Sequence, residues 1–326
     1  MITAAFAVLT LAGCGGSSDD AAPTGADGGN VRLIAYSTPR EAYGKLIDLY
    51  TSGPGEGVSF DQSYGSSGEQ SRAVEAGLRA DVVAFSLEPD MTRLVEQGLV
   101  PADWNAGEHK GMVTDSVVVF MVRDGNPKGI KAWDDLTKEG VEVVTPNPFT
   151  SGGARWNVMA GYGAQLEQGR TPTQAREYLR ALFKNVSVQD KSARESLTTF
   201  AAGKGDVLLA YENEAIFAER QGQPFEYVVP DQTILIENPL AATTDASEAG
   251  KGFVEFLLTD DAQKVFGDDG YRPVSKAVFD TFDFPTPVSL FTIADLGGWD
   301  KVQTEFFDRE DGFMADVQRE LGQPTD

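Results

Sequence analysis

The centre of the chain reads Pro146-Asn147-Pro148-Phe149-Thr150-Ser151-Gly152-Gly153-Ala154-Arg155-Trp156-Asn157. Val141 to Thr145, before it, has the composition of a short strand. The apolar residues from Trp156 to Leu166 recur at helical spacing. Ser151 is a natural N-cap, and the two glycines after it allow another group to approach the backbone closely. Because the first N–H groups of a helix lack partners and carry partial positive charge, this turn indicates either a small anion site or an ordinary capped helix start.

Two further stretches have the same character. Val58 to Gln62 reads as a strand, Ser63-Tyr64-Gly65-Ser66-Ser67-Gly68 forms a turn, and Glu69 to Leu78 reads as a helix. Another strand, Val31 to Tyr36, leads into Ser37-Thr38-Pro39, which can cap and begin a helix. Turns of this kind are consistent with one anion held by several helix starts, and they are equally consistent with capping alone.

The rest of the chain alternates strand and helix patterns, which indicates an α/β fold with largely parallel sheets. Ligands of such sheets bind outside the carboxyl ends of the strands, where these Ser/Gly turns lie. The further predicted strands are 81–85, 116–123, 186–188, 206–211 and 225–229, and the further predicted helices are 88–97, 173–183, 192–202, 214–220, 248–258, 260–266 and 312–321.

Composition limits the possible functions. The 326 residues suffice for two domains with substantial cores. The net charge of −23 argues against nucleic acid as a partner, and it also repels anions, so an anion must be attracted by a local arrangement of donors. Cys14 is the only cysteine, so no intramolecular disulfide can form. Because His109 is the only histidine, a Cys/His zinc site is excluded. Any Ser-His or Cys-His catalytic pair would have to use His109. The sequence shows no other cluster of metal-ligating residues.

Several runs make the chain recognisable, and they occur in order from about residue 31 onward. On them the chain resembles the sulfate-binding proteins of bacterial sulfate/thiosulfate ABC importers, which are periplasmic-type solute receptors. The runs are Asp61 to Gly68, Gly125-Asn126-Pro127-Lys128, Val144 to Pro148, Ser151 to Asn157, Ala181 to Val186, Gly205 to Ala215, Tyr271-Arg272-Pro273 and Leu290 to Ile293.

The resemblance implies a two-lobed periplasmic binding protein fold of type II. Each lobe is then a central, mainly parallel sheet flanked by helices. One lobe is expected to comprise residues 31–117 plus 237–326, and the other residues 118–236. The resemblance further implies a monomeric receptor rather than an enzyme, without a cofactor or a metal, that closes on sulfate and delivers it to the transmembrane subunits of an ABC permease.

The resemblance also implies which residues meet the anion. The hydroxyls of two serines and the backbone N–H groups of four other residues are expected to donate to it. The family places a Trp indole N–H where Tyr211 stands, which is a departure: a phenol donates through its O–H but can also accept. The contacting residues are Ser37, Ser67, Ser151, Gly152, Gly153, Ala193 and Tyr211.

Three charged residues are expected to support the site from behind. Arg155 and Arg194 follow contacting residues, and they are expected to pair with carboxylates such as Glu212 and Glu214 rather than to bind the anion directly. Asp61 is expected to brace the Ser63–Gly68 turn. A site made of donors favours sulfate, which only accepts, over monohydrogen phosphate, whose proton needs an acceptor. The sequence offers only Tyr211 and Asp61 as such acceptors.

Alternative functions remain open on the sequence. The same receptor could bind thiosulfate, molybdate or tungstate, or phosphate. An ester hydrolase that uses Ser67 or Ser151 as nucleophile is a more distant alternative, because its base would have to be His109 or a lysine such as Lys191.

The first thirty residues resemble a lipoprotein signal peptide followed by a tether. Ile2 to Leu11 is apolar but too short to span a bilayer. Leu11-Ala12-Gly13-Cys14 resembles a lipobox, in which the Cys is lipidated, and Gly15 to Asn30 is a polar tether. The resemblance implies an anchor on the outer face of the cell membrane; a chance signal-like run is the alternative. The usual basic segment is absent, which suggests a start codon further upstream.

Overall fold

The strands join in one hydrogen-bonded path of order β2-β1-β3-β9-β4-β7-β5-β6. The computed structural model describes residues 29–325. The strands on the path are β1 (Asn30–Tyr36), β2 (Ser59–Gly65), β3 (Val82–Ala84), β4 (Met112–Arg123), β5 (Val143–Pro146), β6 (Val186–Asp190), β7 (Val207–Tyr211) and β9 (Gln232–Ala242). Three more strands attach to it, namely β8 (Phe225–Val228), β10 (Arg272–Pro273) and β11 (Ser289–Phe291).

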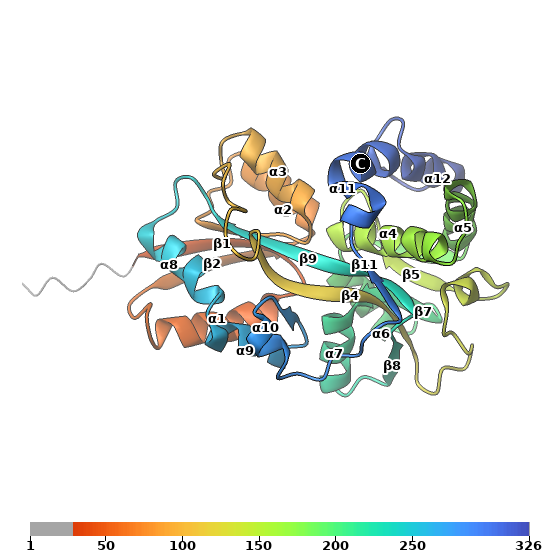
Figure 1. Cartoon of the computed structure of the whole chain (residues 1–326), viewed down its shortest axis with the longest axis horizontal. Coiled ribbons are helices and arrows are strands. Elements are labelled where there is room, and N and C mark those ends of the chain that lie inside the picture. The colour runs from red at the N-terminus through yellow and green to blue at the C-terminus, as the bar shows by residue number, and fades with distance from the viewer. Residues whose placement is uncertain (1–28, 326) are drawn as a thin grey trace, which may run out of the picture.

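Two long antiparallel strands, β4 and β9, connect two groups of elements (Figure 1). β4 pairs with β9 over Met112–Val117 and with β7 over Val118–Val122. β9 pairs with β3 over Leu240–Ala242. We call the group around β1–β3 the first half and the group around β5–β8 the second half.

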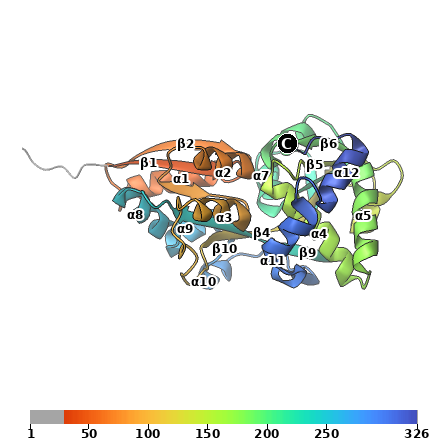
Figure 2. The same cartoon turned by 90° about the horizontal axis from the view of Figure 1, so that it is seen from above.

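In the first half, β1 lies between β2 and β3 and is parallel to both. Helices cover this small sheet on both faces (Figure 1), and Figure 2 shows the first half lying beside the second half. These helices are α1 (Arg40–Thr51), α2 (Ser67–Glu75), α3 (Glu88–Glu96), α8 (Glu248–Leu257), α9 (Asp260–Asp268) and α10 (Lys276–Phe279).

In the second half, β5 lies between β6 and β7 and is parallel to both. Its helices are α4 (Gly152–Glu167), α5 (Pro172–Lys184), α6 (Ala193–Ala201), α7 (Glu212–Arg220), α11 (Gly298–Val302) and α12 (Phe313–Leu321). The predicted α/β class is thus confirmed, with parallel pairs in each half and antiparallel pairs along β4 and β9.

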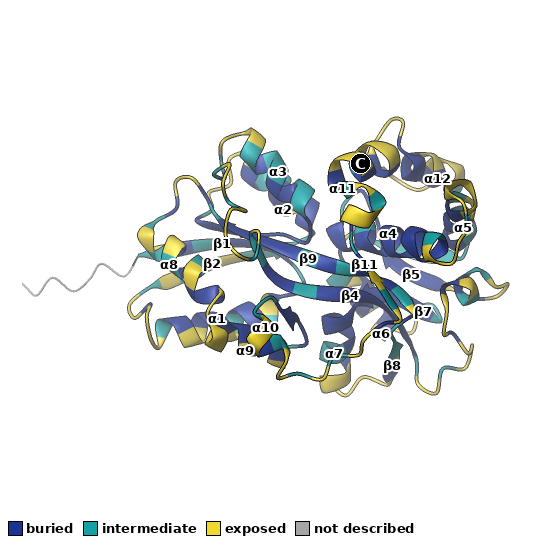
Figure 3. Ribbon diagram, in the orientation of Figure 1, coloured by how far each residue is buried: buried dark blue, intermediate teal, exposed yellow. Residues whose placement is uncertain are grey.

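Helix α4 is the most deeply buried helix of the second half (Figure 3). The helix predicted from Trp156 onward begins four residues earlier, at Gly152. The Asn157 side-chain amide donates to Thr145 Oγ1 on β5 and to the Leu209 carbonyl on β7, at 3.0 Å each. These bonds attach α4 to two parallel strands, β5 and β7, close to the place where the helix begins.

The C-terminal segment departs from the predicted division, which placed residues 237–326 in one piece with the first half. From β11 onward the chain packs on the second half instead. The Trp299 ring meets the Trp156 ring edge-on, with centroids 4.7 Å apart, and Phe306 packs edge-on against Tyr162. The segment lies there because its aromatic side chains bury apolar surface against α4.

Within residues 29–325, no helix has both the length and the apolar composition that crossing a bilayer would require. The expected signal peptide, tether and Cys14 lie outside the described residues.

Carboxylates meet on the connecting strands. Asp115 on β4 lies opposite Glu237 on β9 and opposite Arg272 on β10. The Arg272 guanidinium is held by Glu212, with Nε–Oε2 at 2.7 Å. Burial and the negative charge of Glu237 raise the pKa of Asp115 to about 7, although the positive charge of Arg272 acts to lower it. An ionised Asp115 is therefore disfavoured in the folded chain.

We predict that Asp115→Asn stabilises the chain more at pH 8 than at pH 5. The unfolded carboxyl titrates near pH 4 and the folded one near pH 7, so the folded chain binds more protons between these values and native stability falls as pH rises through them. An asparagine side chain at position 115 does not titrate, so the variant does not lose stability as the pH rises. Thermal unfolding should give a gain on the order of 1–2 kcal/mol at pH 8, because partial exposure reduces the full effect. A gain that is the same at both pH values would contradict the prediction.

Candidate functional site

A small cavity lies between the two halves, where several helices begin. Its volume of about 10 Å³ is close to the space that one water-sized sphere needs. None of the described residues that line it carries a charged side chain. The lining consists of Tyr36, Ser37, Thr38, Ser66, Ser67, Ser86, Ser151, Gly152, Gly153, Ser192, Ala193 and Tyr211.

Four of these lining residues occupy N-cap positions. Ser66, Ser151, Ser192 and Tyr211 precede α2, α4, α6 and α7 respectively. The Ser192 hydroxyl accepts the Glu195 N–H at 3.3 Å, as an ordinary cap does. Ser66 and Ser151 make no side-chain capping bond. The starts of α2 and α4 therefore keep free N–H groups at the cavity, and the partial positive charge of the starts of α2, α4 and α6 lies there.

All seven residues that the sequence analysis expected at the anion line this one cavity. They come from the β1–α1 turn and from the starts of α2, α4, α6 and α7, which are far apart in the sequence. The structure thus brings the whole set together. It also adds Tyr36, Thr38, Ser66, Ser86 and Ser192 to the lining, which the sequence analysis did not include.

The hydroxyl of Ser67 does not have the free proton that the sequence analysis assigned to it. It donates to Asp90 Oδ2 at 2.6 Å and accepts the Ser86 N–H at 2.9 Å. Because a hydroxyl has a single proton, Ser67 Oγ cannot also donate to a ligand. The expectation of a Ser67 hydroxyl contact is therefore corrected. What remains available is the Ser67 backbone N–H at the first position of α2.

Ser86 joins the two halves at the cavity. Its hydroxyl lies 2.8 Å from the Tyr211 hydroxyl, which comes from β7 in the second half. Its carbonyl accepts the Trp156 indole N–H at 2.7 Å and the Asn238 side-chain amide at 3.1 Å. Ser86 follows the buried strand β3, so the rule that ligands gather at strand ends pointed to this position, although no Ser/Gly turn marked it.

Gly152 is required where α4 approaches Ser86. A Cβ atom at Gly152 would lie 2.5 Å from Ser86 Oγ and 2.8 Å from Leu87 Cδ2, both in the first half. At Gly153 the closest atom would be Tyr211 Cε1, at the ordinary distance of 3.4 Å. The absence of a side chain at Gly152 is therefore a condition for the two halves to lie this close together.

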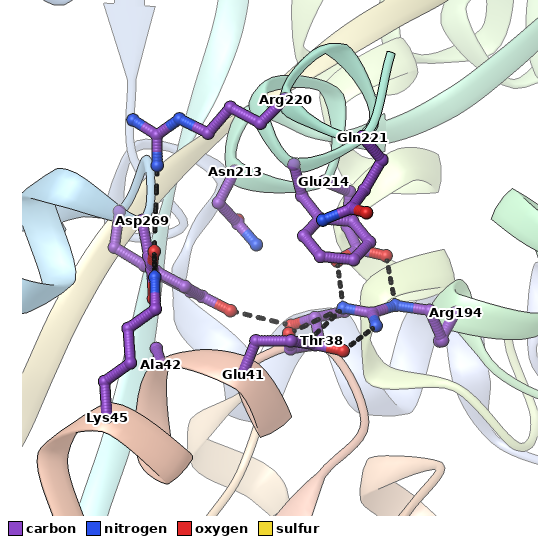
Figure 4. A pocket seen from close by; sticks show the side chains of 12 residues that line it. Thr38, Glu41, Ala42, Lys45, Arg194, Asn213, Glu214, Arg220, Gln221 and Asp269 are labelled. Atoms are coloured by element: carbon purple, nitrogen blue, oxygen red, sulfur yellow. Dashed lines mark hydrogen bonds and ion pairs between the residues drawn. The ribbon is translucent and has the colours of Figure 1, made fainter. Parts of the chain in front are cut away.

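Arg194, which follows Ala193, links the two halves in a second, neighbouring pocket, which Figure 4 shows from close by. Its guanidinium donates to both carboxylate oxygens of buried Glu214 on α7, at 2.9 and 3.0 Å. It also donates to both oxygens of Glu41 on α1, at 2.8 and 3.0 Å, and to the Thr38 carbonyl. Although burial acts to lower it, the two carboxylates raise the pKa of Arg194 above its usual range. The predicted pairing of Arg194 with Glu214 is confirmed.

The other two supporting residues differ from expectation. Arg155 donates to the Pro148 carbonyl and to Gln303 Oε1, at 2.8 and 2.9 Å, so it braces the loop before α4 through neutral groups. Asp61 accepts from Asn30 Nδ2 at 2.6 Å, in an exposed position. It does not line the cavity and cannot serve there as an acceptor. Lys191, the candidate base, is likewise exposed and outside the lining.

Comparison with known proteins gives consistent results. Residues 31–272 match the family model of bacterial extracellular solute-binding proteins. The sulfate-binding protein of Synechococcus elongatus is 41% identical, with 96% of this chain and 93% of that protein covered. The thiosulfate-binding protein of Escherichia coli K12 is 34% identical, with 84% and 86% covered. The solved structure of the sulfate-binding protein SubI from Mycobacterium tuberculosis superimposes with a TM-score of 0.83 at 44% identity, covering 86% of this chain and 99% of that one.

We predict that the two carboxylates that pair with Arg194, those of Glu214 and Glu41, contribute unequally to the stability of the folded chain. Arg194→Met leaves buried Glu214 without its partner, which should lower the free energy of unfolding by about 3–5 kcal/mol. Glu41→Gln, at a side chain that is 38% exposed, should lower it by at most about 1 kcal/mol. Urea unfolding of the full chain measures both. Equal losses in the two variants would show that Glu214 does not depend on Arg194.

Proposed function

The chain belongs to the sulfate-binding protein family of ABC import systems, and on this premise we propose that it is the extracytoplasmic receptor that captures sulfate for such an importer. The family consists of solute-binding proteins and not of enzymes. The observation that carries the proposal is the convergence of neutral donors from four helix starts on one small cavity between the halves.

The donors at the cavity suit a small anion that only accepts hydrogen bonds. We assign the anion contacts to the backbone N–H groups of Ser37, Ser67, Gly152, Gly153 and Ala193, together with the hydroxyls of Ser151 and Tyr211. A desolvated dianion without partners would be unstable by many kcal/mol. Roughly seven hydrogen bonds to charge, at about 1.5–3 kcal/mol each, can offset that penalty.

One buried hydroxyl group at the cavity lacks a hydrogen-bond partner among the described residues. Ser66 Oγ is buried and has no hydrogen-bond partner among the described residues. A buried polar group left unpaired costs about 1–3 kcal/mol. An anion at the cavity would accept this proton, which supports a bound oxyanion as the normal occupant. The small volume argues against a larger metabolite.

Closure follows from the division of the donors between the halves. Ser37 and Ser67 belong to the first half, and Ser151, Ala193 and Tyr211 to the second. An anion bound to both sets therefore stabilises the closed arrangement relative to an open one. We propose that the two halves are the two lobes, with β4 and β9 as the hinge and the segment from β11 onward in the second lobe.

We further propose that Cys14 carries a lipid that holds the receptor at the outer face of the cell membrane. The sequence Leu11-Ala12-Gly13-Cys14 after an apolar run supports this assignment, as does the polar stretch that follows it. A lipid-tethered receptor stays close to the transmembrane subunits of its permease, to which it delivers sulfate.

The function is tested by calorimetric titration of residues 29–326 with sulfate, thiosulfate, molybdate and phosphate at pH 8. We expect sulfate to bind. We expect Gly152→Ala to weaken sulfate binding at least about tenfold, because its Cβ meets Ser86 and Leu87 and prevents closure. Gly153→Ala, with only ordinary contacts, is the matched control and should change affinity less.

Two results of this titration would count against the proposal. Binding of another oxyanion but not of sulfate would be consistent with the proposed receptor role and would overturn the assignment of sulfate as the ligand. Equal affinities in the two glycine variants would overturn the role of closure. Thermal unfolding of each variant ensures that a loss of binding is not a loss of folding.

The anchor is tested with the full chain expressed in a bacterium that processes lipoproteins. The native chain should sediment with membranes, and its N-terminal peptide should have the mass of a diacylglyceryl cysteine. Cys14→Ser should release the protein into the soluble fraction, because the thioether to lipid cannot form. Membrane association that survives this substitution would rule out Cys14 as the anchor.

A further inference from the structure

Three ion pairs cross between the two halves of the described chain. They are Arg272 with Glu212, Arg194 with Glu41, and Arg220 with Asp269. The first lies beside the connecting strands, because Arg272 is opposite Asp115 on β4. The other two lie in the neighbouring pocket of about 300 Å³, which α1 and the end of α9 line from the first half and α6 and α7 line from the second (Figure 4). We call these two pairs the clasp.

The pair of Arg194 with Glu41 can open at low cost. Across the boundary between the halves, the guanidinium donates to both Glu41 oxygens, at 2.8 and 3.0 Å. Within its own half, Arg194 also donates to both oxygens of buried Glu214. If the halves separate, Arg194 and Glu214 stay paired, so no buried charge loses its only partner. Glu41 does lose its partner, but its side chain is 38% exposed and water can solvate it.

The pair of Arg220 with Asp269 repeats this arrangement with the roles of the halves exchanged. Arg220 Nη1 lies 3.7 Å from Asp269 Oδ1. The Asp269 side chain is only 12% exposed, and it is also paired with Lys45 of α1 in its own half. Arg220, whose side chain is 50% exposed, has no such need of its partner. Opening of the halves therefore releases only the exposed member of this pair as well.

The clasp adjoins the anion cavity without forming part of it. Arg194 follows Ala193 of the cavity wall, and it donates to the Thr38 carbonyl at 2.9 Å. Thr38 lines both spaces. None of the four clasp residues is among the described residues that line the anion cavity. The clasp can therefore influence a bound anion only through the positions of the turns and halves around it.

We propose that the clasp sets how long the receptor stays closed on its anion. This inference rests on the proposed closure of the two halves on sulfate. Because the two pairs form only when the halves meet, they stabilise the closed arrangement and slow the escape of the anion, while its capture by the open arrangement does not depend on them. Glu41 and Arg220 are thus positioning residues that raise the affinity without touching the ligand.

The test is the kinetics of sulfate binding by the full chain, followed by stopped-flow tryptophan fluorescence. Trp156 reports on closure, because its indole N–H donates to the Ser86 carbonyl across the halves. Glu41→Gln removes the charge of one clasp pair and keeps the size of the side chain. Its dissociation rate constant should rise about twofold to fivefold, as expected for a partly exposed ion pair, while its association rate constant should stay nearly unchanged.

Two further variants separate the clasp from other effects of lost charge. Arg220→Met removes the second pair and should raise the dissociation rate constant about twofold, less than Glu41→Gln because the contact is longer. In the double variant the two increases should multiply, because the pairs share no residue. Glu305→Gln is the matched control, since it breaks a pair with Arg176 that is similarly exposed, at 39% and 38%, but lies within the second half. Its rate constants should be those of the native chain.

Three results would overturn the clasp. The first is a dissociation rate constant that does not change in Glu41→Gln and Arg220→Met. The second is an equal increase in Glu305→Gln, which would show a general effect of charge rather than of contact between the halves. The third is an increase in Glu41→Gln alone, which would show that this residue acts on the adjacent turn. All three leave the proposed function intact, whereas absence of sulfate binding by the native chain would overturn that function and the clasp with it.

Discussion

Four helices begin at the same small cavity, and the starts of α2 and α4 leave N–H groups there that no side chain caps. Groups of this kind need an acceptor, and they can share one only if the two halves meet. The arrangement of the chain follows from this requirement. β4 and β9 bring the halves together, Asn157 attaches α4 to β5 and β7, and Gly152 allows α4 to approach Ser86.

Charge is arranged in shells around this neutral lining. The whole chain carries −23, which would repel an anion at long range. Arg194 lies directly behind the lining, yet its charge is shared between Glu41 and Glu214. Asp90 lies behind Ser67 and accepts its proton. The ion pairs therefore hold the turns in place without offering a free cation, and the attraction at the cavity comes from backbone dipoles. Such a site should depend on geometry more than on ionic strength, because dipoles act only over short distances.

Much of this could be predicted from the sequence, because Ser/Gly turns between strands and helices are local signals. The seven expected contact positions lie together, and the α/β class is as the alternation of patterns indicated. What could not be predicted depends on partners far apart in the sequence. The Ser67 proton goes to Asp90, 23 residues away, and Ser86 faces Tyr211 across 125 residues. Asp61 was misplaced because its position on β2 gives no indication that Asn30 is its partner. The C-terminal aromatic residues signalled burial but not the half in which they are buried.

The course of the C-terminal segment has a consequence for the whole molecule. The described chain starts at β1 in the first half, and it ends beside α4, where the Pro324 carbonyl accepts the Asn147 side-chain amide at 3.0 Å. The two ends of the described chain therefore belong to different halves. The proposed closure would change the distance between these ends, so a pair of dyes placed near residues 30 and 325 would report it in single molecules without a label near the cavity.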